Sequence, residues 1–74
     1  PQGAYIAEVI EGSGADRAGI RAGDIITKFG EDIVSELEDG LGEAIEKYNP
    51  GDAVKVTLWR DGETMELTVT LSVS

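Results

Sequence analysis

The sequence predicts a small α+β domain, and three features support this prediction. Apolar and polar residues alternate over residues 54–59 and again over 65–71, which is typical of two half-buried strands. Between residues 36 and 48, apolar residues recur at spacings of three and four, which predicts an amphipathic helix. A stretch bounded by glycines at residues 12–19 predicts one further, shorter helix. A chain of 74 residues is long enough for one domain, which we assign to residues 1–74.

Residues 12–19 carry the signals that begin and end a short helix. Ser13 is a suitable N-cap, because its hydroxyl can accept a backbone N–H that the first helical turn leaves unpaired. Asp16, three residues later, can accept a second N–H and lies at the positive end of the helix dipole. Gly19 can adopt the positive φ that a helix end often requires, and Ile20 can fold back as a hydrophobic cap.

Three extended segments are predicted around this short helix. Residues 3–10 begin at a glycine and are rich in β-branched and aromatic side chains, which predicts a strand. Residues 25–29 predict a second short strand that ends at Gly30, and residues 31–34 predict a brief third one.

The longer helix is predicted over residues 36–48, with Ser35 as its N-cap and acidic residues in its first turn. One apolar stripe runs along it, formed by Leu37, Leu41, Ala44, Ile45 and Tyr48. Gly40 and Gly42 fall inside this helix, where each costs about 1 kcal/mol relative to alanine. They are interpreted either as glycines that the helix tolerates despite this cost or as positions where another backbone approaches closely. Residues 49–52, with the sequence Asn-Pro-Gly-Asp, end the helix.

The last third of the chain predicts a β-hairpin. Asp61 and Gly62 separate the two alternating runs, and a type I′ turn needs positive φ at both of its central residues. Trp59 would lie on the outward face of the first strand, where it is either a cross-strand packing residue or an anchor for an interaction.

Composition argues against several classes of function. The chain contains neither cysteine nor histidine, so it lacks thiolate ligands and the commonest general base. A formal net charge of −9 argues against binding to nucleic acid or to an anionic membrane, since both depend on clustered Lys and Arg. The sequence also has no apolar run near the roughly 18 residues that a membrane span needs.

The individual polar residues do not form a catalytic or metal-binding pattern either. The acidic residues within 36–39 lack the spaced frame of a calcium loop, and we interpret them as ordinary acids at a helix start. Ser13 and Ser35 have no His or Lys partner in a nucleophile motif. The glycines of residues 12–19 do not have the spacing of a phosphate-binding loop. We therefore expect no catalytic residue, no metal and no cofactor.

One motif is specific enough to indicate a family. Residues 12–26 follow the pattern Gly-Ser-X-Ala-Asp-X-Ala-Gly-Ile-X-X-Gly-Asp-Ile-Ile, which resembles the signature of PDZ domains in HtrA/Deg-type serine proteases. The resemblance continues through GAYIAEV before the motif and AIEKYNPGDAVKVTLWRDGE after it, so it covers nearly the whole chain. It implies a small PDZ-like, partly open antiparallel β-barrel or sandwich, of the circularly permuted bacterial type, with one short and one longer helix.

The resemblance also implies a function. PDZ domains capture an extended peptide or a protein C-terminal tail by β-strand addition, so this chain is expected to be a non-catalytic recognition module of a periplasmic or otherwise extracytoplasmic serine endoprotease. On the helix side of the groove, the resemblance places the peptide-binding positions at Glu38, Leu41, Gly42 and Ile45, with Leu41 also on the core-facing stripe.

The other side of the expected groove is incomplete in this sequence. In the family, a carboxylate-binding loop and the binding strand precede the strand that GAYIAEV resembles, and the sequence begins too late to contain them. We therefore expect an N-terminally truncated domain with an open backbone edge over Ala4–Val9, carried chiefly by Ala4, Tyr5, Ile6 and Ala7. Self-association or complementation by a separate segment would pair that edge.

Two alternatives to this function remain open. The motif at residues 12–26 is shared with PDZ modules of site-2 metalloproteases, tail-specific proteases and secretion components. The chain could also be an engineered or truncated scaffold that binds no peptide.

Overall fold

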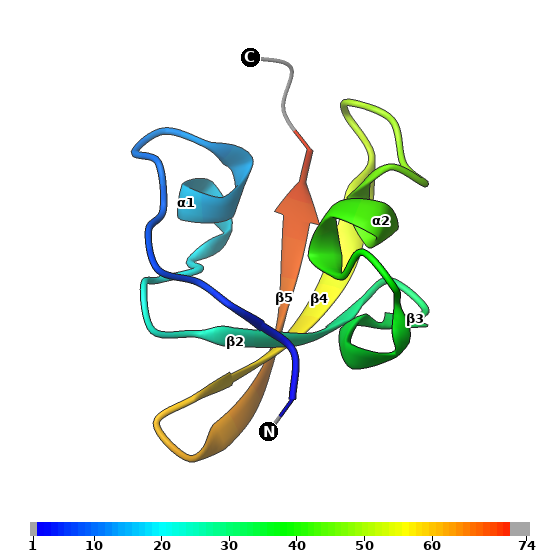
Figure 1. Ribbon diagram of the computed structural model, residues 1–74. Helices are drawn as coiled ribbons and strands as arrows, with labels where there is room; N and C mark the ends of the chain where they lie inside the picture. The colour runs from blue at the N-terminus through cyan, green and yellow to red at the C-terminus, as the bar shows by residue number, and fades with distance from the viewer. Residues whose placement is uncertain (1, 72–74) are drawn as a thin grey trace.

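The computed structural model describes residues 2–71 and consists of one antiparallel sheet with two short helices (Figure 1). The elements in chain order are β1 (Ala4–Tyr5), α1 (Gly14–Ala18), β2 (Ile25–Phe29), β3 (Asp32–Ile33), the 3₁₀ turn η1 (Val34–Glu36), α2 (Leu41–Ile45), β4 (Ala53–Arg60) and β5 (Glu63–Thr70). The strand order is β1-β2-β4-β5, and β3 pairs with β2 outside this path. In Figure 1 the helices α1 and α2 lie on either side of the C-terminal end of β5.

The short helix α1 is confirmed together with both of its caps. The Ser13 hydroxyl accepts the Asp16 N–H at 3.2 Å, and the Asp16 carboxylate accepts the Gly12 N–H at 2.8 Å. Gly19 has φ of 98° and follows the last helical residue. The Ile20 N–H donates to the Ala15 carbonyl at 3.1 Å, which completes a Schellman motif and buries the Ile20 side chain.

The hairpin of β4 and β5 is confirmed as well. Asp61 and Gly62 have φ of 48° and 87°, the two positive values that a type I′ turn requires. The two strands pair along their whole length, from Arg60 opposite Glu63 to Ala53 opposite Thr70. Trp59 lies opposite Thr64 and is half-buried.

The core lies between the sheet and the helices. Its buried members are Ile20, Ile26, Phe29, Val34, Ala44, Val54, Val56, Leu58 and Val69. The Phe29 and Tyr48 rings meet edge to face with their centroids 5.6 Å apart, a favoured aromatic geometry. The alternation of β4 therefore sets the inward face of the sheet, and β2 contributes the largest core side chains.

The prediction of a longer helix over residues 36–48 is wrong. Residues 34–36 form the 3₁₀ turn η1, Leu37 is extended, and α2 spans only Leu41–Ile45, so it is no longer than α1. Gly40 breaks the helix with φ of 64° and ψ of −142°, a conformation that glycine adopts without the steric cost of a Cβ. Ser35 accordingly lies inside η1 and does not cap a helix.

The strand predicted over residues 3–10 is also too long. Regular pairing with β2 covers Ala4 and Tyr5, and two further hydrogen bonds join Ile6 to the turn that precedes β2. The partner chain turns away at Arg21–Asp24, so residues 7–10 have no β2 backbone opposite them and leave the sheet.

Candidate functional site

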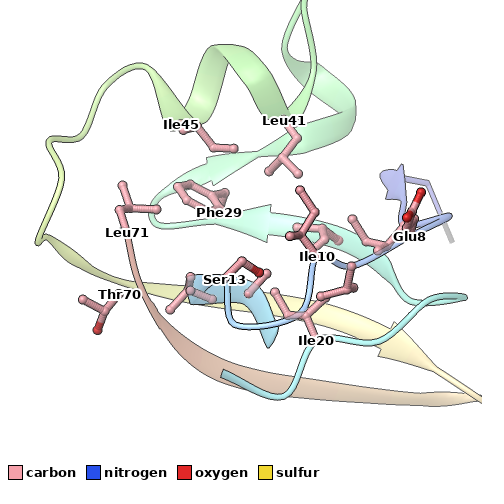
Figure 2. Close-up of a pocket in the computed structure, with 15 residues that line it drawn as sticks. Glu8, Ile10, Ser13, Ile20, Phe29, Leu41, Ile45, Thr70 and Leu71 are labelled. Atoms are coloured by element: carbon pink, nitrogen blue, oxygen red, sulfur yellow. The ribbon is translucent and has the colours of Figure 1, made fainter. Parts of the chain in front are cut away.

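An apolar groove of about 290 Å³ lies between the segment 6–10 and α2 (Figure 2). Core residues form its floor, and the C-terminal end of β5 closes one end. The apolar residues that line it are Ile6, Val9, Ile10, Ala15, Ile20, Ile26, Phe29, Leu41, Ile45, Val69 and Leu71. Such a concave, mainly apolar surface is typical of a site that binds apolar side chains.

The α2 wall of the groove is formed by Leu41 and Ile45. These residues are four positions apart, so both side chains lie on one face of the helix, and Figure 2 shows them side by side above Phe29. Ile45 is 40% exposed, which is high for an isoleucine that also contacts an apolar surface.

The facing wall is the irregular segment that follows β1. Ile10 lines the groove and is 74% exposed, so large apolar side chains are accessible on both walls. Glu8 is the one charged residue among the described residues that line the groove.

The backbone beside this wall is open on one side. The Ile6 N–H donates to the Asp24 carbonyl at 2.8 Å, and the Ile6 carbonyl accepts the Gly23 N–H at 2.7 Å, so both groups of Ile6 point toward β2. Successive residues of an extended chain point their backbone groups to opposite edges, so those of Tyr5 and Ala7 point away from β2. The strand order places β1 at the end of the sheet formed by residues 2–71.

The structure brings together only some of the residues that the sequence predicts for the site. Leu41 and Ile45 line the groove, and so does Ile6. Gly42 is exposed on α2 with open space around the position of a Cβ, and Glu38 is exposed in the turn that precedes α2. Ala4, Tyr5 and Ala7 lie on the adjoining chain, with Ala4 packed against the core and the other two exposed.

Sequence reasoning missed the groove residues that come from other parts of the chain. Ile10, Phe29 and Leu71 are far apart in sequence, and only the packing of the sheet against α2 brings them to one cavity. The one available signal was Ile10, an apolar residue at the end of a predicted strand and beside a glycine-rich turn.

Outside the groove, Asp24 is the buried polar residue of the core, and sequence reasoning missed its partner. Arg60 Nε and Nη2 donate to its carboxylate at 2.8 and 2.6 Å, and the Arg21 N–H donates to it at 2.8 Å. The hydrogen bonds from Arg60 lower the pKa of Asp24, outweighing the opposite effect of burial. This ion pair joins the turn before β2 to the end of β4, so its role is structural.

The described residues contain no cluster of three or more acidic side chains placed to hold a metal ion. Among the same residues, no helix is long and apolar enough to cross a membrane.

Comparison with known proteins gives one family match and several related serine proteases. The PDZ domain family matches residues 1–71. The chain is 40% identical over 73 residues to the periplasmic pH-dependent serine endoprotease DegQ of Escherichia coli, covering 99% of this chain and 16% of that protein. It is 42% identical over 72 residues to the serine protease Do-like HtrA of Lactococcus lactis, covering 97% and 17%. The chain thus spans about a sixth of the length of these relatives.

A solved structure with the same fold belongs to a different kind of peptidase. The crystal structure of an aminopeptidase N family protein from Idiomarina loihiensis superimposes with a TM-score of 0.79 and 27% sequence identity. The match covers 96% of this chain and 12% of that one.

Proposed function

The chain belongs to the PDZ domain family, and we propose that it binds extended peptide segments as a non-catalytic module of a longer peptidase. The observation that carries the proposal is the apolar groove between segment 6–10 and α2, which lies next to an open strand edge. Peptide capture by strand addition needs these two features together: backbone groups that can pair with the ligand, and pockets that take its alternate side chains.

The geometry supports a definite arrangement for such a ligand. An extended segment added to the free edge of β1 would pair with the outward backbone groups of Tyr5 and Ala7. Alternate side chains of that segment would then face the groove and contact Ile45 and Leu41 of α2. The segment could be a C-terminal tail or an internal stretch of another protein, a strand from elsewhere in the same chain, or a second copy.

The parent protein is proposed to be a serine endoprotease of the HtrA/Deg type. The support is the identity of about 40% to two such proteases, across nearly all of this chain. By the same similarity, the proposed location is the periplasm or another extracytoplasmic compartment. In that setting the module would recognise substrates or regulate the protease domain.

A second type of parent is favoured by one observation. The chain superimposes on part of an aminopeptidase N family protein, so the host could be another class of peptidase. The coding sequence on either side of these 74 residues tests this directly. A serine protease domain in the same reading frame supports the first host, and an aminopeptidase domain supports the second.

The binding proposal is tested with two isoleucines of similar exposure. Ile45 lines the groove and is 40% exposed, whereas Ile33 lies on β3, is 47% exposed and does not line the groove. A fluorescein-labelled nine-residue peptide that alternates valine and serine is titrated into the protein and its Kd measured by anisotropy. Ile45→Ser should weaken binding about tenfold, because an apolar contact is lost, and Ile33→Ser should leave the Kd within about twofold. Equal losses in both variants, or no saturable binding by the unmodified chain, would refute the proposal.

A further inference from the structure

The two segments that flank the apolar groove carry acidic residues and no basic ones. Segment 6–15 contributes Glu8 and Glu11, and residues 38–46, which contain α2, carry four acidic residues and neither Lys nor Arg. Those four are Glu38, Asp39, Glu43 and Glu46. Glu8 lines the groove itself.

Three of the six basic residues of the chain are paired with carboxylates outside these segments. Arg60 is bound to Asp24, and Lys47, the first cation after α2, is bound to Asp32 at 3.1 Å. Lys55 Nζ on β4 lies 3.8 Å from Glu66 Oε2 on β5. No Lys or Arg of the described residues lines the groove. An occupant would therefore meet an apolar floor and a lining in which the one charged side chain of the described residues, Glu8, is acidic.

We propose that this groove selects extended peptides in which apolar residues alternate with Lys or Arg, and discriminates against peptides that carry Asp or Glu at those positions. This inference rests on the proposed function and names the ligand class for the same site. Apolar side chains of the peptide would contact Ile10, Leu41 and Ile45. The long cationic side chains between them would point away from the floor and reach the edges of the groove, near Glu8 and in the negative field of the carboxylates of residues 38–46.

Physical chemistry favours this occupant over the other candidates. A concave site with low-dielectric walls and one sign of charge concentrates ligands of the opposite sign and accelerates their association. An anionic lipid or a fatty acid would fit the apolar floor, but Glu8 and the carboxylates of residues 38–46 would repel its negative charge. A second copy of this chain also carries a formal charge of −9, which opposes self-association.

Three matched peptides test the inference. Each has nine residues that alternate valine with lysine, with serine or with glutamate, and Kd is measured at 50 and 300 mM NaCl. At 50 mM the lysine peptide should bind at least tenfold tighter than the glutamate peptide, with the serine peptide between them. At 300 mM the ratio should shrink several-fold, since salt screens exposed charges.

The outcomes separate this inference from the proposed function. If the serine peptide binds but the lysine peptide binds no tighter than the glutamate peptide, charge selection is refuted and peptide binding stands. If none of the three binds, both proposals fail. A lysine preference that does not change with salt would also overturn the electrostatic account.

A charge-neutralising variant tests whether the preference for the lysine peptide arises at the groove. Glu8→Gln combined with Glu46→Gln removes one carboxylate from each of the two segments that flank the groove, and both residues are exposed, so the fold should persist. The affinity for the lysine peptide should fall about three- to tenfold, while the serine peptide should change less than twofold. Glu63→Gln on β5 is the control because it removes an exposed carboxylate far from the groove along the sheet. Equal losses in the control, or equal losses for both peptides, would contradict the assignment.

Discussion

The guanidinium of Arg60 makes two hydrogen bonds with the buried carboxylate of Asp24, at 2.8 and 2.6 Å, and a third with the Gly19 carbonyl at 2.8 Å. Asp24 is only 1% exposed and lies at the start of β2, 36 residues before Arg60 in the sequence. The pair thus connects the end of α1, the turn before β2 and the end of β4. The turn before β2 in turn holds Ile6, the first residue of segment 6–10, through hydrogen bonds to Gly23 and Asp24.

Replacing this carboxylate should destabilise the domain substantially. Asp24→Asn keeps the shape of the side chain but removes its charge, and its amide cannot accept all the N–H donors of Arg21 and Arg60. We expect the free energy of unfolding to fall by about 2–3 kcal/mol, the usual range for losing charge-assisted hydrogen bonds at a buried site. Urea unfolding at pH 7 measures it. Lys55→Met, which removes one member of an exposed pair, is the control and should change stability by less than about 0.5 kcal/mol.

The same carboxylate should make stability depend on pH in the acidic range. The hydrogen bonds from Arg60 hold the pKa of Asp24 below its usual value of 3.8 in the folded protein. A depressed folded pKa stabilises the native state above the unfolded pKa, and this contribution is lost as pH falls through the folded pKa. The stability difference between the unmodified chain and Asp24→Asn should therefore be largest above about pH 5 and shrink below pH 4. A difference that stays constant from pH 6 to pH 2.5 would be inconsistent with this assignment.

Gly30 should tolerate no side chain because of Tyr48. A Cβ at Gly30 would overlap the Tyr48 hydroxyl, and its φ of 62° is already unfavourable for other residues. Gly30→Ala should lower the free energy of unfolding by about 2–3 kcal/mol, as strain and overlap add. Gly62→Ala, with φ of 87° and open space around it, should lose only about 1 kcal/mol.

A double-mutant cycle with Tyr48→Phe isolates the overlap. Removing the hydroxyl should recover part of the loss in Gly30→Ala, while the ring carbon 3.0 Å from the added Cβ keeps the rescue incomplete. Additive effects of the two substitutions would show that backbone strain alone explains the cost.

The role of Gly42 in peptide binding stays a prediction. Gly42 is exposed and has open space around the position of a Cβ, so a larger side chain should fit without unfolding the domain. If this position faces the peptide, Gly42→Leu should change the Kd of the valine-serine peptide at least fivefold while the urea midpoint stays nearly constant. An unchanged Kd would remove Gly42 from the site and leave Leu41 and Ile45 as its residues on α2.

Hydrogen exchange should reveal which backbone edge the ligand uses. In the free protein the Ile6 amide, bonded to the Asp24 carbonyl, should exchange slowly relative to those of Tyr5 and Ala7. Saturating peptide should protect Tyr5 and Ala7 and leave Ile6 little changed, as NMR exchange rates can measure. Protection that rises with protein concentration in the absence of peptide would instead indicate self-association through this edge.

Local sequence was sufficient for the elements whose determinants lie within a few residues of one another. The caps at Ser13 and Gly19 and the positive φ values of Asp61 and Gly62 depend on short-range hydrogen bonds and on the steric freedom of the backbone. Alternation likewise predicted the inward face of β4. The motif around α1 also predicted the family, since its glycines mark backbone turns that this fold requires.

Features that depend on partners far apart in the sequence form only in the folded chain. The apolar spacing of residues 36–48 predicted one helix, but Leu37 is extended and Gly40, with φ of 64°, precedes α2, so only Leu41–Ile45 are helical. The groove gathers Ile10, Leu41 and Leu71 from three separate parts of the chain, and Asp24 meets Arg60 only when β2 pairs with β4. The turns and the family of this domain therefore follow from short stretches of its sequence. The site was decided by packing, because a cavity belongs to no single segment of the chain.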